Sequence, residues 1–145
     1  MAVGQGWEAQ LRSWHRVYRA NGLAHVVKTE APVKVIRQMG KGRFVAVYSR
    51  KGPVDFIGAA RGLGTVAFDA KHTDKSTFAV SVVPEHQRRD LDRWADQGAV
   101  TFIALRCSHG CYVLPWERVR HMSGALDPRE VGRAMDEDGW LSCLF

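Results

Sequence analysis

The order of helical and extended patterns along the chain restricts its fold more than any other feature. Apolar residues recur at helical spacing from Trp7 to Tyr18 and predict a first helix over residues 4–20. Short extended runs follow, and a second helical pattern over residues 85–97 separates them from a closing pair of strands. This order of a helix, a run of strands, a second helix and two closing strands predicts an α/β fold, with a mixed central β-sheet flanked by helices.

Glycine and proline set the expected limits of these elements. Gly58 is expected to end one strand, and Pro84 and Gly98 are expected to flank the second helix. Weaker helical patterns occur at residues 115–120 and 128–135. The expected strands cover residues 24–28, 32–38, 44–48, 54–57, 65–71, 100–106 and 112–114.

The length of 145 residues suits one domain with its own core. We expect this domain to span residues 1–124, with residues 34–51 as a protruding basic β-hairpin or stalk, and residues 125–145 as a C-terminal tail with a short helix. No basic region followed by an apolar run opens the chain, and no run of about 18 apolar residues occurs in it. Neither a signal peptide nor contact with a membrane is therefore expected.

The three cysteines, an odd and sparse set, argue against a disulfide framework and for a reducing cytoplasm. The segment from Cys107 to Cys111 also contains His109, so its residue types would suit zinc. Structural zinc sites usually combine two close-spaced pairs of ligands, and no second pair is present in the sequence. A strand–turn–strand hairpin is the favoured interpretation, and zinc is the lesser alternative.

The excess of basic residues favours a polyanionic partner. The chain has 21 lysines and arginines against 15 acidic residues, a net charge of +6, and nucleic acid is the usual partner of such a protein. The basic residues of the second helix could be a solvated face, but the excess charge favours a track for DNA phosphates. The expected DNA contacts from this pattern are Arg37, Lys41, Arg43, Arg88 and Arg89.

The strand over residues 65–71 carries the most informative chemistry. Side chains alternate along a strand, so Asp69 and Lys71 share one face while Phe68 and Ala70 point to the other. The preceding strand brings Asp55 beside Asp69. Two such carboxylates can share a hard divalent cation, which lowers the pKa of a bound water and polarises a phosphate. The Lys71 ammonium can orient that water or offset charge in the transition state.

An acid-x-Lys triplet alone is weak evidence, because 15 acidic residues and six lysines in 145 positions yield about 0.6 such triplets by chance. Alone it is better explained as a solvated strand edge with an incidental ion pair. The ordered set around it resembles the RecU-type Holliday junction resolvases of the PD-(D/E)XK nuclease superfamily, over about residues 4–117. The segments that carry the resemblance are Gly6-Trp7-Glu8, Lys28 before Ala31-Pro32-Val33, Val54-Asp55-Phe56, Phe68-Asp69-Ala70-Lys71, Ser76-Thr77-Phe78 and His86-Gln87.

This resemblance implies a restriction-endonuclease-like core and a homodimer that depends on Mg²⁺ or Mn²⁺ and nicks two opposed strands of a four-way DNA junction. In it Asp55 and Asp69 would ligate metal and Glu8 would add a third carboxylate. Lys71 would assist the attacking water, and Gln87 would support the site. The implied class is an Mg²⁺-dependent endodeoxyribonuclease, at work in the cytoplasm of a bacterial cell and encoded by the host or by a phage.

The resemblance also makes Lys28 and Thr77 expected DNA contacts. The chain departs from the family pattern in two places: Asp69 stands where the family usually has Glu, and the hairpin is shorter than the family's stalk. Two alternatives stay open. One is a nuclease of the same fold acting on duplex, flap or overhang DNA, and the other is a non-catalytic nucleic-acid-binding module.

Several residues could have either a functional or a purely structural role. Glu8 could serve only to complement the dipole of the first helix. His86 could be a ligand or general base, or a helix-start histidine bonded to backbone. His72 points away from Lys71 and is expected to be structural or to contact phosphate. Trp7 and Trp14 lie on the apolar stripe and are expected in the core.

Overall fold

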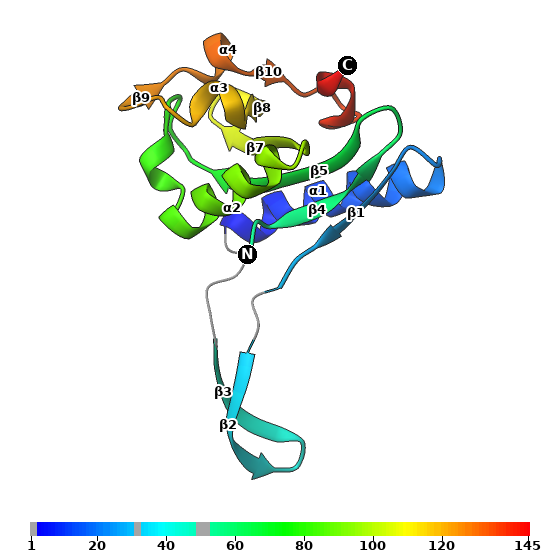
Figure 1. Ribbon diagram of the computed structural model, residues 1–145, viewed down its shortest axis with the longest axis vertical. Helices are drawn as coiled ribbons and strands as arrows, with labels where there is room; N and C mark the ends of the chain where they lie inside the picture. The colour runs from blue at the N-terminus through cyan, green and yellow to red at the C-terminus, as the bar shows by residue number, and fades with distance from the viewer. Residues whose placement is uncertain (1–2, 31–32, 49–52) are drawn as a thin grey trace.

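The chain forms a six-stranded mixed sheet with helices on both faces, and a separate β-hairpin stands away from this body (Figure 1). The computed structural model describes residues 3–30, 33–48 and 53–145. The helices are α1 (Val3–Ala20), α2 (Glu85–Asp96), α3 (Trp116–Val119) and α4 (Pro128–Val131), with 3-10 turns η1 (Val80–Val82) and η2 (Leu141–Leu144). The strands are β1 (Ala24–Lys28), β2 (Val33–Gly40), β3 (Arg43–Tyr48), β4 (Phe56–Ala60), β5 (Gly64–His72), β6 (Phe78–Ala79), β7 (Val100–Cys107), β8 (Gly110–Pro115), β9 (Ala125–Leu126) and β10 (Arg133–Ala134).

The main sheet has the strand order β1-β4-β5-β7-β8-β10. Strands β5 and β7 are parallel, and the other neighbouring pairs are antiparallel. Parallel neighbours need a long crossover, and α2 lies within the connection between these two strands. The predicted mixed α/β architecture is confirmed.

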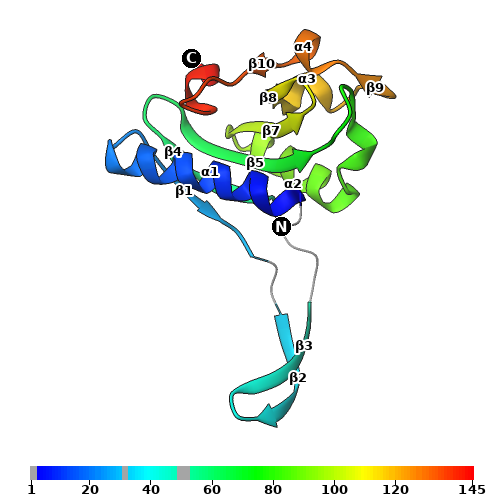
Figure 2. The same ribbon diagram turned by 180° about the vertical axis from the view of Figure 1, so that it is seen from behind.

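Each face of the sheet is covered by its own helices. Helix α1 lies on one face and α2 on the other, as the two opposite views show (Figures 1 and 2). Alternation along β5 sends Phe68 into the apolar cluster that contains Leu11 of α1, and sends Ala67 into the cluster that contains Leu91 of α2. Because both faces are buried, β5 is a central strand and polar side chains along it are enclosed.

A row of three stacked phenylalanines crosses the sheet beneath α1. Phe56, Phe68 and Phe102 are direct partners in the register of β4, β5 and β7, with ring centroids 5.1 and 4.3 Å apart. All three rings are fully buried, and the buried Trp7 indole donates a hydrogen bond of 2.9 Å to the Ala104 carbonyl beside them. This phenylalanine row stabilises one register of the three strands, since cross-strand aromatic pairs favour direct opposition.

The segment from residue 136 to the C-terminus packs on α1. Trp140 is fully buried, and its indole nitrogen donates to Nε2 of His15 at 2.9 Å. The Tyr18 hydroxyl donates to the Asp138 carbonyl at 2.5 Å. Glycine is required at position 139, between Asp138 and Trp140, because φ there is +95° and a Cβ would lie 2.4 Å from the Tyr18 oxygen. Residues expected to form a tail therefore supply side chains to the core under α1.

Two predicted boundaries were wrong. Gly58 does not end a strand; β4 begins at Phe56 and continues through Gly58 to Ala60. A Cβ at Gly58 would lie 2.1 Å from the His25 carbonyl oxygen, so glycine is needed there for close approach of β1. The helix expected over residues 128–135 ends at Val131, because the following residues pair with β8 instead.

The two predicted hairpins are present. Strands β2 and β3 pair antiparallel, and the turn between them has positive φ at Gly40, Lys41 and Gly42. Residues 49–51 of the predicted hairpin lie outside the described residues. Strands β7 and β8 form the second hairpin, in which Cys107 pairs with Gly110, and the three cysteines are free thiols. In the described ranges no helix is long and apolar enough to cross a membrane.

Buried His15 should make folding stability depend on pH. Burial lowers the pKa of His15 to about 4, whereas the unfolded chain titrates near 6.5. Between these values the unfolded state binds more protons. The free energy of unfolding should therefore fall as the pH is lowered from 6.5 to 4, by up to about 3 kcal/mol from this group.

Urea unfolding at pH 7, 5.5 and 4.5 measures this effect against a His15→Asn variant, whose amide oxygen can still accept from Trp140. In the His15→Asn variant the free energy of unfolding should fall much less as the pH is lowered. In His121→Asn, at an exposed histidine, it should fall as in the wild type. Equal slopes for the His15 variant and the wild type would contradict the assignment.

Candidate active site

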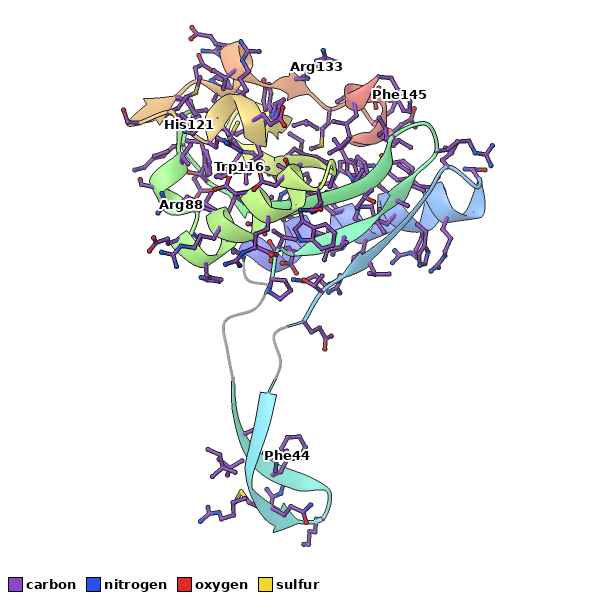
Figure 3. The ribbon with its side chains drawn as sticks, in the orientation of Figure 1. Phe44, Arg88, Trp116, His121, Arg133 and Phe145 are labelled. Carbon is purple, nitrogen blue, oxygen red and sulfur yellow. The ribbon has the colours of Figure 1, made fainter. Side chains whose placement is uncertain are left out.

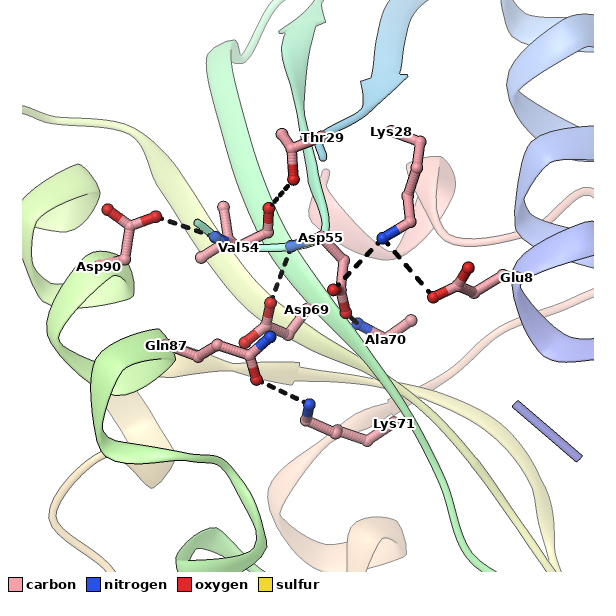
Figure 4. A network of polar contacts seen from close by, with 10 residues as sticks. All are labelled: Glu8, Lys28, Thr29, Val54, Asp55, Asp69, Ala70, Lys71, Gln87 and Asp90. Atoms are coloured by element: carbon pink, nitrogen blue, oxygen red, sulfur yellow. Dashed lines mark hydrogen bonds and ion pairs between the residues drawn. The ribbon is translucent and has the colours of Figure 1, made fainter. Parts of the chain in front are cut away.

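The carboxylates of Asp55 and Asp69 each accept a hydrogen bond from the backbone beside the other aspartate (Figure 4). The Asp55 amide donates to Oδ1 of Asp69 at 2.9 Å, and the Ala70 amide donates to Oδ2 of Asp55 at 2.9 Å. The pairing of Phe56 with Phe68 sets this arrangement, because each aspartate directly adjoins one member of that pair. The structure thus brings together the two carboxylates that the sequence placed on neighbouring strands.

Asp69 is fully buried, and only one of its two oxygens accepts a hydrogen bond from the described residues. Within the described residues, Oδ2 of Asp69 accepts no hydrogen bond. Burial first, and then the charge of Asp55, raise the pKa of Asp69 to about 7, although Lys71 lowers it. A buried carboxylate with a free oxygen is costly unless a cation or a proton compensates it, so the position favours one of the two.

Lys71 lies on the same face of β5 as Asp69, two residues further along. Its ammonium nitrogen donates to Oε1 of Gln87 at 2.8 Å. Gln87 belongs to the first turn of α2, which packs over this face of the sheet. The hydrogen bond therefore holds the Lys71 charge in one place beside the two carboxylates (Figure 4).

Lys28 bridges the site to α1. Its Nζ lies 3.5 Å from Oδ1 of Asp55 and 3.7 Å from Oε1 of Glu8, and it sits over the Phe56 ring at 5.6 Å from the centroid. The side chains of Glu8, Lys28 and Asp55 are 32, 26 and 17% exposed, so this part of the site is open to solvent. Glu8 thus joins the group through Lys28, a residue predicted only as a DNA contact.

Two residues of the network were missed by sequence reasoning. Asp90 accepts a hydrogen bond of 2.9 Å from the Val54 amide, and the Thr29 hydroxyl donates to the Val54 carbonyl. Both contacts fix the backbone immediately before Asp55. The spacing of Asp90 three residues after Gln87, on one face of α2, was an available signal. Thr29 has no comparable signal in the sequence.

Outside this network, the predicted DNA contacts of the hairpin near Phe44 lie apart from those around Arg88 of α2 (Figure 3), and Thr77 directly precedes β6. Arg88 is half-buried and its Nε has no partner among the described residues, whereas Arg89 pairs with Glu85 at 2.8 Å. In the same described ranges the His86 side chain forms neither a hydrogen bond nor an ion pair. The predicted contacts that are exposed are Arg37, Lys41, Arg43, Thr77 and Arg89.

The donor set fits a hard divalent cation. Carboxylate oxygens are the ligands that Mg²⁺ and Mn²⁺ prefer. Burial, and then the charge of Asp55, raise the pKa of Asp69, whose Oδ2 has no hydrogen-bond partner among the described residues. Over the part of the chain that the structure describes, no three histidine, cysteine or acidic side chains stand in a metal-holding cluster. Asp55 and Asp69 would therefore share such an ion with water or phosphate, ligands that Mg²⁺ commonly keeps.

The sequence matches the family model described as "Recombination protein U" over residues 3–129. The chain belongs to the RecU family. It is 28% identical over 128 residues to the Holliday junction resolvase RecU of Bacillus pumilus (strain SAFR-032), covering 79% of this chain and 62% of that protein. It is 30% identical over 111 residues to the Holliday junction resolvase RecU of Geobacillus thermodenitrificans (strain NG80-2), covering 72% of this chain and 55% of that protein. This RecU chain thus spans 55 to 62% of the length of these two relatives.

The RecU fold seen here is similar to a 1.6 Å structure of Archaeoglobus fulgidus Hjc, a Holliday junction resolvase from an archaeal hyperthermophile. The TM-score is 0.53 at 17% identity, over 90% of this chain and 95% of that one. At this identity the likeness concerns the fold. The predicted RecU membership and the predicted restriction-endonuclease-like fold are both confirmed.

Asp69→Asn should stabilise the metal-free protein at alkaline pH. The folded state holds the Asp69 proton up to about pH 7, but the unfolded chain releases it near pH 3.8, so wild-type stability declines as the pH rises through this window. The gain from the amide should be small at pH 4 and reach up to about 4 kcal/mol at pH 8.

Chemical denaturation in EDTA at pH 4, 6 and 8 measures this gain. Asp96→Asn, at an exposed position of α2, is the matched control and should change stability little. A variant that is destabilised equally at all three pH values would show that burial of the Asp69 charge costs nothing.

Proposed function

We propose that this RecU protein is a divalent-metal-dependent endonuclease that resolves four-way DNA junctions by paired phosphodiester hydrolysis. The observation that carries the proposal is the close placement of the Asp55 and Asp69 carboxylates, with one buried Asp69 oxygen that has no partner among the described residues and the Lys71 ammonium held nearby by Gln87. Membership of the RecU family and the names of its relatives support the same activity.

The residues divide the chemistry between them. Asp55 and Asp69 would hold an Mg²⁺ or Mn²⁺ ion, which would polarise the scissile phosphate and make the attacking water more acidic. Gln87 fixes the Lys71 ammonium, which can orient the water and offset negative charge that grows on the phosphate. Glu8 would bring a third carboxylate to the edge of the site, where Lys28 pairs with both Asp55 and Glu8.

A four-way junction supports the further proposal of a homodimer. Two opposed strands of a junction are related by a near two-fold axis, and a two-fold symmetric dimer presents one site to each of them. The net charge of +6 suits such a polyanionic substrate. The relatives named above are bacterial, and we place the reaction in the bacterial cytoplasm, on host or phage DNA.

Asp55→Asn should remove cleavage while junction binding is retained. The amide keeps the hydrogen bond from Ala70 but not the charge that holds a cation, so the cleavage rate should fall on the order of 100-fold or more. The measurement is nicking of labelled four-way junction, flap and linear duplex with Mg²⁺, beside binding in EDTA, and Asp96→Asn is the control.

The pattern of cleavage over the three DNA substrates distinguishes between the candidate functions. Symmetric paired nicks confined to the junction support resolution, and nicks mainly in flap or duplex would indicate a nuclease with another substrate. Wild-type protein that binds DNA but cuts none of the three would indicate a non-catalytic binding module.

Arg37→Ala combined with Lys41→Ala should weaken junction binding and flatten its salt dependence. Both side chains are exposed on the hairpin, and loss of two phosphate contacts should reduce the slope of log K against log salt by about 1.8. Fluorescence anisotropy at several salt concentrations measures both quantities. An unchanged affinity and slope would remove the hairpin from the binding surface.

A further inference from the structure

A groove of about 300 Å³ lies between α1 and β1, and we call it the α1–β1 groove. Val26 and Phe56 contribute its apolar lining. Four of its lining residues are permanent cations, and no described residue that lines it is acidic. These cations are Arg12, Arg16, Arg19 and Lys28.

The three arginines form a row along α1. They lie four and then three residues apart, which places them on one face of the helix, and all three are exposed. From Arg12 to Arg19 the helix rises by about 10 Å. Leu11 and Tyr18, on the other side of α1, are buried in the core. The arginine row therefore borders the groove without taking part in packing.

The charge of this row is not compensated by the fold. Among the described residues, no ion pair or hydrogen bond involves the side chains of Arg12, Arg16 or Arg19, whereas on the opposite side of the sheet Arg89 pairs with Glu85 and Arg120 with Asp92. Like charges at this helical spacing are mildly destabilising. An anion from outside the chain would supply the missing partner.

The α1–β1 groove reaches the proposed catalytic carboxylates. Lys28 lines it and also lies 3.5 Å from Asp55, and Phe56 follows Asp55 in the chain. Glu8, one turn before Arg12 on α1, meets Lys28 at the same place (Figure 4). An anionic polymer lying in the groove would therefore arrive at Asp55.

We propose that the α1–β1 groove binds backbone phosphates of the DNA strand that continues from the scissile bond. This inference rests on the proposed function and adds a substrate surface that is separate from the hairpin. One strand of B-DNA carries a phosphate every 3.4 Å or so along the axis, so the arginine row spans about three phosphates. Such contacts set the position of the strand and carry no base sequence, so the groove aligns the strand with Asp55 and Asp69.

The test compares two double variants with equal loss of charge. Arg12→Gln with Arg16→Gln removes half of the groove cations and keeps helix propensity. Arg118→Gln with Arg129→Gln removes two exposed arginines on α3 and α4. Junction affinity is measured by anisotropy in EDTA at several salt concentrations. The groove variant should bind at least 10-fold more weakly with a slope smaller by about 1.8, and the control should bind like the wild type.

The outcomes separate this inference from the proposed function. A groove variant with wild-type affinity and slope, or equal losses in both double variants, overturns the groove even if the wild type resolves junctions. If the wild type cuts no DNA but only the groove variant loses DNA affinity, the groove stands and the nuclease function falls. Thermal unfolding of both variants should stay close to the wild type, because all four side chains are exposed and an exposed ion pair such as that of Arg129 with Asp127 contributes little to stability.

Discussion

The site depends on the register that the phenylalanine row (Phe56, Phe68 and Phe102) imposes on three strands. Because side chains alternate along a strand, a slip of one residue would turn Asp69 towards α1 and place Phe68 where the carboxylate belongs. The stacked rings make such a slip costly, since three large apolar side chains would leave one core for the other. The apolar packing under α1 therefore determines that the polar groups of Asp55 and Asp69 meet between β4 and β5.

That register gives Asp69 a position that folding alone would not favour. Its carboxylate is enclosed on a central strand, accepts one amide, and faces the charge of Asp55. The fold tolerates this because the surrounding network is otherwise satisfied: Gln87 holds Lys71, and Asp90 holds the backbone before Asp55. Among the described residues, one oxygen of the buried Asp69 carboxylate is left without a hydrogen bond, and a cation could compensate it there.

Strand alternation and element order were sufficient to predict the mixed sheet and the meeting of Asp55, Asp69 and Lys71. They could not predict that β4 continues through Gly58, because the close approach of β1 is a property of the assembled sheet. Nor could they predict the core position of Trp140. The residues around it have no periodic pattern, and its partner His15 lies 125 positions away. Tertiary contacts of this kind leave no local signature.

Packing of the C-terminal segment on α1 links the end of the chain to the helix that borders the α1–β1 groove. Tyr18 and Trp14 hold the carbonyls of Asp138 and Glu137, while the exposed side of the same helix carries the arginine row and Glu8. The last ten residues thus hold α1 in position through these hydrogen bonds and through packing. Substitutions in this segment would shift α1 and, with it, the arginine row, although the segment itself does not line the α1–β1 groove. The need to pack on α1 therefore constrains the sequence of this segment.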